Sequence, residues 1–178
     1  MSEDELLARI DALEARVREL EDDREIRDLL AKYGYTADNC DDEGFVDLYT
    51  DDGEIRMALT PEAAASSFGG GRSEVVFAGK DGVRTFITLP EGHHSPALYG
   101  VSMHLHGTNL TTYVDGDDAV ANSYHLALAT ADGETTVVSA ANNRWRFRRV
   151  DGRWRIRERR SATLGDAPFA TNLDFDDD

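Results

Sequence analysis

Histidines in the middle of the chain carry its clearest chemical signal. His104 and His106 are two residues apart in the strand-like segment VSMHLHGTNL, so both side chains are expected on one sheet face. His125 lies in the next strand-like segment and is expected across from them. Imidazoles that share a face suit acid–base chemistry or a metal, and a structural, hydrogen-bonded role is an equal alternative. His93 and His94 lie in a loop with Gly and Pro and are expected to be solvated.

A phenol and a carboxylate in the segment KYGYTADNCDD suit the same chemistry. Tyr33 and Asp38 are five residues apart, which is about 140° of rotation on a regular helix, so they share a face poorly. Both can reach one cavity only where the helix ends, and Asn39, Asp41 and Asp42 indicate such an end. The alternative is that Tyr33 belongs to the core and Asp38 is a cap or a solvated carboxylate.

Arginines gather in the last two strand-like segments, where they alternate with Trp145, Phe147, Trp154 and Ile156. The favoured interpretation is an outer strand face whose arginine stems lie along the sheet and whose charges are solvated. The alternative is a basic patch that holds an anionic carrier or a cofactor phosphate. The arginines are Arg144, Arg146, Arg148, Arg149, Arg153, Arg155, Arg157, Arg159 and Arg160.

The elements that must hold these side chains follow from the spacing of apolar residues. Helical spacing predicts helices over 3–21, 24–38, 42–50 and 79–89. Strands are predicted over 54–59, 99–114, 118–131, 135–150 and 153–164. Helices followed by a long meander predict an α+β fold with the helices on one face of a curved antiparallel sheet. Residues 60–74, rich in Ala, Ser and Gly, are expected to form a mobile surface loop or lid.

Composition excludes several classes of function. The 178 residues fit one domain, and 40% hydrophobic with 30% charged residues is a globular composition. The net charge of −16 disfavours nucleic-acid and membrane partners because it repels phosphates and anionic lipid. The single cysteine, Cys40, excludes an internal disulfide, and the acidic start MSEDELLARI is unlike a signal peptide, so a cytoplasmic protein is expected. Motifs for nucleotide binding and for common hydrolases are missing.

The two ends of the chain are expected to lie outside the main domain. Near the N-terminus, apolar residues at alternating spacings of 4 and 3 form a short seam: Leu6, Ile10, Leu13, Val17 and Leu20. This helix, within residues 1–22, is expected to pack on its own domain or on a neighbouring subunit. The domain then spans residues 23–165, and the acidic tail 166–178 is expected to be disordered.

The order of these motifs resembles a known family. A heptad-like helix is followed by REIRDLLAKYGYTAD, DDEGFVDLYTDDGEI, GKDGVRTFI, SMHLHGTNL and an arginine-rich strand ending in VDGRWRIRERR. This order resembles the SnoaL-like branch of the nuclear-transport-factor-2-like superfamily. Within that branch it is most similar to bile-acid 7α-dehydratase, scytalone dehydratase and hexachlorocyclohexane dehydrochlorinase. The resemblance implies a cone-shaped α+β barrel, in which a bent sheet wraps around helices and encloses a deep apolar pocket.

The resemblance also implies a catalytic group. Matching the family's motifs assigns catalytic roles to Tyr33, Asp38 and His104, with His106 as the alternative base. Tyr49 matches, less closely, the region of a further pocket tyrosine. The bile-acid enzyme has a pocket arginine where this chain has Thr163, which argues against a bile-acid-like substrate.

The expected function is a cofactor-independent dehydratase or isomerase that acts on a hydrophobic polyketide-, steroid- or terpenoid-like molecule, without metal or cofactor. The alternatives are a polyketide cyclase of the same fold, a non-catalytic binding or assembly module, and a metal enzyme that uses the three sheet histidines. A homo-oligomer, trimer or dimer, is expected because the similar dehydratases are oligomeric. The residues expected to bind substrate are Tyr49, Phe86, His106, His125, Asn143 and Trp145.

Overall fold

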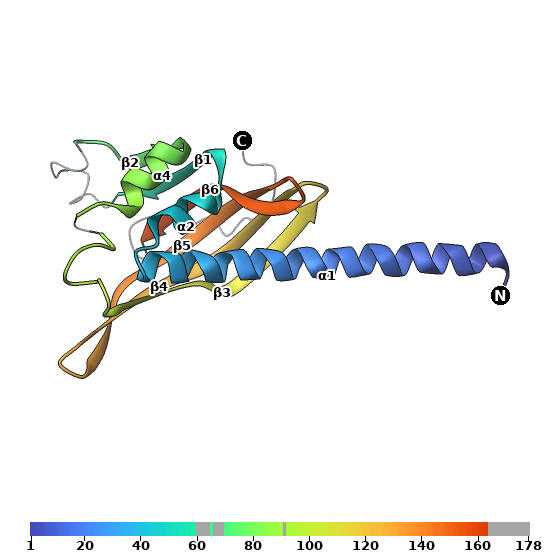
Figure 1. The fold of residues 1–178 in the computed structure, drawn as a ribbon, viewed down its shortest axis with the longest axis horizontal. Helices are drawn as coiled ribbons and strands as arrows, with labels where there is room; N and C mark the ends of the chain where they lie inside the picture. The colour runs from blue at the N-terminus through green and yellow to red at the C-terminus, as the bar shows by residue number, and fades with distance from the viewer. Residues whose placement is uncertain (60–64, 66–69, 91, 164–178) are drawn as a thin grey trace.

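One long helix, α1 (Glu3–Asp38), crosses a face of the sheet and extends far beyond it in the computed structural model (Figure 1). The structure describes residues 1–59, 65, 70–90 and 92–163. Ser2 and Glu5 form a reciprocal capping box that starts α1. The sequence predicts two helices here, but the charged segment at 21–24 contains neither Gly nor Pro, so nothing interrupts the helix.

The six strands form one mixed, open sheet in the order β2-β1-β6-β5-β4-β3. Their bounds are β1 Tyr49–Ala58, β2 Glu74–Ala78, β3 Ser102–Asp115, β4 Asp118–Ala131, β5 Glu134–Val150 and β6 Arg153–Thr163. Adjacent strands pair antiparallel except β1 and β6, which are parallel because the C-terminal strand inserts between β1 and β5. The predicted α+β class is confirmed, with this one parallel pairing as the difference.

Bulges bend the edge strand β3 over α1. The register between β3 and β4 shifts between Leu105 and Thr108 and again between Thr108 and Thr111. Asn109 between them has a φ of 53°, the left-handed conformation that Asn tolerates better than most residues. Because bulges increase local bending and twist, β3 curves around the helix, and its first half meets the C-terminal end of α1.

Two short helices complete the layer that covers the sheet. The helix α2 (Asp42–Asp47) follows α1 after a tight turn, and α4 (Gly79–Ile87) packs on β1. The strand β2, which the sequence analysis does not predict, pairs with β1 and leads directly into α4. Large apolar side chains from all these layers form the core, among them Ile26, Leu30, Phe45, Ile55, Val83, Ile87, Trp145, Phe147 and Ile156.

The first part of α1 is exposed. Residues up to Leu20, including the apolar seam, are exposed with respect to the part of the chain that the structure describes. Most of the predicted loop 60–74 and the acidic tail 166–178 lie outside the described residues. Among the described helices, none combines the length and apolarity that crossing a membrane requires.

Candidate active site

The end of α1 brings Asp38 to His104. Asp38 is the last residue of the helix, and its Oδ1 lies 2.5 Å from Nδ1 of His104. Its second oxygen, Oδ2, accepts a hydrogen bond of 3.0 Å from the backbone N–H of His104. The His104 side chain is only 7% exposed and that of Asp38 16%. Both carboxylate oxygens are therefore committed to one histidine, which fixes the orientation of the imidazole ring.

Gly34 makes this close approach possible. It lies one helical turn before Asp38, where α1 touches β3. A Cβ at this position would lie 2.5 Å from the backbone oxygen of His104, well inside van der Waals contact. Only glycine therefore lets the helix and the strand approach closely enough for the Asp38–His104 pair. The sequence analysis does not identify this residue, because a glycine inside a helix has no motif of its own.

Three further histidine rings lie close to the ring of His104. The rings of His104, His106 and His125 are within 9° of parallel, and the His106 and His125 ring centroids are 4.5 Å apart. The two-residue spacing thus places His104 and His106 as predicted. The expectation that His93 is solvated is wrong: its ring centroid is 4.5 Å from that of His104, because its loop folds back over the sheet. His94 stays at the surface, 2.9 Å from Asp42.

Burial keeps three of these rings neutral. It lowers the pKa of His93 to about 4 and that of His125 to about 3, and the charge of Arg159 adds to both shifts. Burial likewise lowers the pKa of His106 well below its usual value, again with help from Arg159. A buried imidazolium would lose its hydration without gaining a carboxylate partner, so the neutral form is favoured.

A buried arginine lies on the other side of Tyr33. Arg159 is 5% exposed and is the only buried arginine in the part of the chain that the structure describes. Its Nη1 donates a 2.7 Å hydrogen bond to the Tyr33 hydroxyl, and its Nε donates one of 3.1 Å to Oδ1 of Asn143. Among the described residues, no carboxylate forms an ion pair with it. Position 163 is threonine, but the interior beside Tyr33 and Asn143 thus contains an arginine from another position of the same strand.

The sequence analysis assigns Arg159 to the outer face, and a bulge explains the error. Strict alternation from Trp154 and Ile156 would turn residue 159 outward. The register between β5 and β6 shifts after Ile156, which pairs with Phe147, while Glu158 pairs with Arg146. Residue 157 is thus extra, and beyond it the inward positions include 159 and 161. A one-residue bulge reverses which side chains face the core, and no periodicity argument detects it.

Asn143 fixes the proton of His106. Because the amide oxygen of Asn143 accepts from Arg159, its NH₂ group faces Nδ1 of His106, at 3.4 Å. Nδ1 then acts as the acceptor, and the proton of the neutral ring is on Nε2. That Nε2 has no hydrogen-bond partner among the described residues, and neither does Nε2 of His125. With Nδ1 of His93, three buried ring nitrogens of the histidine cluster thus lack a hydrogen-bond partner among the described residues.

The remaining predicted site residues divide into wall and core. Tyr33 packs edge-on against Phe45 and against His106, with centroid distances of 4.6 and 4.4 Å. Tyr49 is buried behind Tyr33, and Phe86 contacts the ring of His93. Trp145 is fully buried, and its indole N–H donates to Ser123, so it forms part of the core beneath the histidines.

The predicted catalytic residues thus converge only in part. Asp38 and His104 are in direct contact, whereas Tyr33 reaches His104 through the ring of His106 and bonds Arg159 instead. Within the described residues, no group of three or more His, Cys, Asp or Glu side chains is arranged to hold a metal ion. A groove of about 390 Å³ between α1 and β3, with Leu30 and Met103 on its sides, gives access to Asp38 and His104.

Comparison with solved structures shows the same fold in other proteins. An NTF2-like protein with a cystatin-like fold from Novosphingobium aromaticivorans is 29% identical, with a TM-score of 0.72 over 87% of this chain and 90% of that one. A proposed scytalone dehydratase from the same species is 19% identical, with a TM-score of 0.61 over 84% and 90%. ActVI-ORFA from Streptomyces coelicolor is 17% identical, with a TM-score of 0.61 over 79% and 96%.

Sequence comparison identifies the family. A search among curated proteins finds no significant match. The family model described as the SnoaL-like domain matches residues 18–160, which include α1 from before its entry into the domain, the Asp38–His104 pair and Arg159. On this match over most of its length, the chain belongs to the SnoaL-like domain family.

Proposed function

We propose that this protein is a cofactor-independent lyase or isomerase of the dehydratase type, with His104 as its general base. The observation that carries the proposal is the contact between Asp38 and His104, in which both carboxylate oxygens bind the same residue. The bond to the backbone N–H holds the Asp38 carboxylate in place, and the bond to Nδ1 orients the His104 ring. A general base must be positioned in this way to accept a proton efficiently.

The geometry supports a defined proton path. With Nδ1–H donating to Asp38, the lone pair of the His104 ring is on Nε2, which can accept a proton from a carbon next to a carbonyl group. The carboxylate of Asp38 then stabilises the imidazolium that forms. The protonated His104 can return this proton to the carbon chain in an isomerisation, or to a departing hydroxyl in an elimination. A positioned base of this kind contributes about 10²–10⁴ in rate.

Arg159 and Tyr33 supply the complementary positive potential. Removal of the C–H proton builds negative charge on the substrate's carbonyl oxygen, and that charge needs a preorganised donor. Arg159 is a buried cation without a carboxylate partner among the described residues, and it polarises the Tyr33 hydroxyl that it binds. We assign stabilisation of the enolate-like oxygen to these two groups, which is worth about 10²–10³ in rate.

The apolar residues near the histidines support a hydrophobic substrate. Leu30 and Met103 line the groove, and Phe45, Phe77 and Phe86 form a chain of ring contacts in the core that continues to His93. Such surroundings favour a flat or polycyclic molecule, such as a polyketide, steroid or terpenoid, with few polar groups. The partnerless Nε2 atoms of His106 and His125 are suited to bind those polar groups.

The test is a reaction assay in heavy water. The protein is incubated with a panel of polycyclic β-hydroxy ketones and unsaturated ketones, and mass spectrometry follows loss of water and uptake of deuterium. We expect His104→Ala and Asp38→Asn each to lower the rate by at least about 10²-fold, because each removes a positioned group. His94→Ala is the matched control, because His94 lies at the surface in the loop that also carries His93. This variant should retain activity.

The outcomes separate the alternative functions. Water loss with a new carbon–carbon bond would identify a polyketide cyclase, whereas tight binding without water loss or deuterium uptake would identify a binding module. Undiminished turnover in a folded His104→Ala variant would refute His104 as the base.

A further inference from the structure

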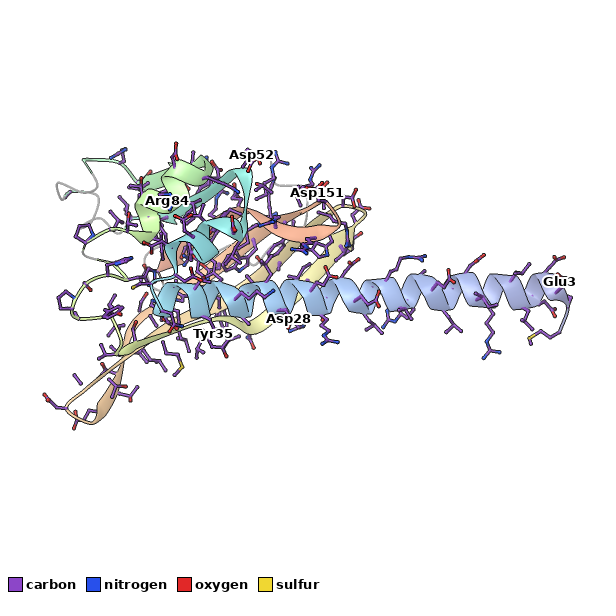
Figure 2. The ribbon with its side chains drawn as sticks, in the orientation of Figure 1. Glu3, Asp28, Tyr35, Asp52, Arg84 and Asp151 are labelled. Atoms are coloured by element: carbon purple, nitrogen blue, oxygen red, sulfur yellow. The ribbon has the colours of Figure 1, made fainter. Side chains whose placement is uncertain are left out.

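The projecting part of α1 carries an apolar seam that none of the described residues of its own chain covers. Figure 2 shows the side chains of this segment, from Glu3 onward, standing apart from the rest of the molecule. The seam consists of Leu6, Ile10, Leu13, Val17 and Leu20, each between 43% and 58% exposed. Exposed apolar residues in a single row, rather than scattered, indicate a binding surface.

The seam does not continue the face that α1 presents to its own domain. The buried residues of the helix, Ile26, Leu29, Leu30, Tyr33 and Ala37, follow one helical stripe. At 3.6 residues per turn the seam lies about 160° around the helix from that stripe. The apolar face thus changes sides where α1 leaves the sheet. A helix extended only to lengthen the intrachain contact would keep its stripe on the same side.

The residue types in the seam favour a two-stranded coiled coil. In heptad notation, Ile10 and Val17 occupy the a positions, and Leu6, Leu13 and Leu20 the d positions. β-branched residues at a with leucine at d are the combination that favours parallel two-stranded coiled coils. The next a and d positions are Arg24 and Arg27, so like charges end the seam where the helix reaches the sheet.

The charges beside the seam select a second copy of this chain in parallel orientation. Arg9 and Arg16 occupy g positions, and Glu14 and Glu21 occupy e positions. In a parallel, in-register pair, each g residue faces the e residue of the next heptad in the other helix. Arg9 would then lie opposite Glu14 of the other copy, and Arg16 opposite its Glu21. Both contacts pair an arginine with a glutamate and are therefore attractive. In an antiparallel pair g faces g and e faces e, which opposes arginine to arginine and glutamate to glutamate.

From these observations we infer that residues 3–21 of two copies of this chain form a parallel, in-register coiled coil. The seam lies on the opposite side of α1 from the buried stripe, and α1 extends far beyond the sheet (Figure 1). In such a pair each domain would therefore lie on the outer side of its own helix. Two heptads are short for a coiled coil, but the helix is continuous with the packed half of α1, so its nucleation cost is already met. The inference does not depend on the proposed reaction.

Light scattering on the full chain tests the contact. Ile10→Glu combined with Val17→Glu places charges in the seam, and the measured mass should fall to half of the wild-type value. Ala8→Glu combined with Ala15→Glu is the matched control, since both alanines are exposed, lie on the same helix and occupy f positions away from the seam. The control should keep the wild-type mass. An equal mass for the wild type and the seam variant overturns the inference.

Cysteine cross-linking tests orientation and register. In a Cys40→Ser background, Leu6→Cys protein should form a disulfide-linked dimer on mild oxidation, because identical d positions face each other in a parallel pair. A mixture of Leu6→Cys and Leu20→Cys proteins should give no mixed dimer. Mixed dimers in place of the Leu6 dimer would show an antiparallel pair. Capture of a different protein by an otherwise monomeric chain would show a heterologous partner, and either result overturns the inference.

Discussion

At the scale of single residues, the candidate site combines an imidazole beside a groove with one deeply buried cation. His104 is held by Asp38 at the end of the groove, whereas Arg159 lies deep beneath Tyr33 and Asn143. An overall charge of −16 would repel an anionic transition state, but the interior next to Arg159 has the opposite sign. In the proposed mechanism the charge of Arg159 therefore matters more than the surface charge, since the field of a buried charge is less screened by salt.

Replacing Arg159 tests whether its positive charge contributes to the proposed reaction. We expect Arg159→Met to lower the catalytic rate by about 10²–10³, as removal of an oxyanion donor does. It should also raise the pKa of Tyr33, because burial already raises that pKa and the charge of Arg159 opposes the shift. Ultraviolet titration of the phenolate measures the second effect without a substrate.

The matched control for this change is Arg157→Met. Arg157 lies on the same strand, half exposed, 3.9 Å from Asp52. It should alter neither the rate nor the Tyr33 titration. Equal rates for the two arginine variants would remove Arg159 from the proposed mechanism.

At the scale of elements, the crossing of α1 over β3 sets the geometry of the base. The helix ends at Asp38, the strand presents His104, and Gly34 allows their backbones to touch. Bulges further along β3 then curve the strand around the helix.

Gly34→Ala should separate these two elements. Because the added Cβ would meet a backbone oxygen, the helix must shift outward by several tenths of an ångström or more. We expect a loss of about 1–3 kcal/mol in the free energy of unfolding, the usual cost of overpacking. The His104 ring resonances in an NMR spectrum should also shift as the bond to Asp38 lengthens. The control is Ala31→Gly, at an exposed position of the same helix. It should lower the free energy of unfolding only by the difference in helix propensity between alanine and glycine, about 1 kcal/mol. Unchanged His104 resonances in Gly34→Ala would contradict this account.

At the scale of the whole molecule, the neutral buried histidines make stability depend on pH. In the unfolded chain these rings take up protons near pH 6.5, whereas folded His125 remains neutral down to about 3. Their contribution to stability is therefore present above pH 6.5 and is lost as the pH falls toward the folded values. Each such ring adds about 1.4 kcal/mol per pH unit to the slope of the unfolding free energy in this range.

Urea unfolding at a series of pH values below 6.5 measures this slope. His125→Asn removes one of the rings. It should lower the slope of the unfolding free energy against pH by the contribution of about one proton. A slope identical to that of the wild type would show that His125 titrates alike in the folded and unfolded chains.

Much of the fold follows from the sequence. Periodicity and turn residues correctly predict the long strands and the helix over 79–89, because local hydrophobic patterns and Asp-Gly turns act over a few residues. The pair of Asp38 and His104 is likewise predicted from motif order, and the structure brings the two side chains together.

What the sequence alone determines is therefore most of the element pattern, the pairing of Asp38 with His104 and the apolar seam of α1. Only the tertiary structure decides that Arg159 faces the core, that His93 is buried and that Gly34 is the contact point. The physical reason is the same in each case. Each feature depends on residues that are far apart in the chain: a bulge, a loop that folds back over the sheet, and a backbone contact between distant elements. Local periodicity therefore cannot predict them.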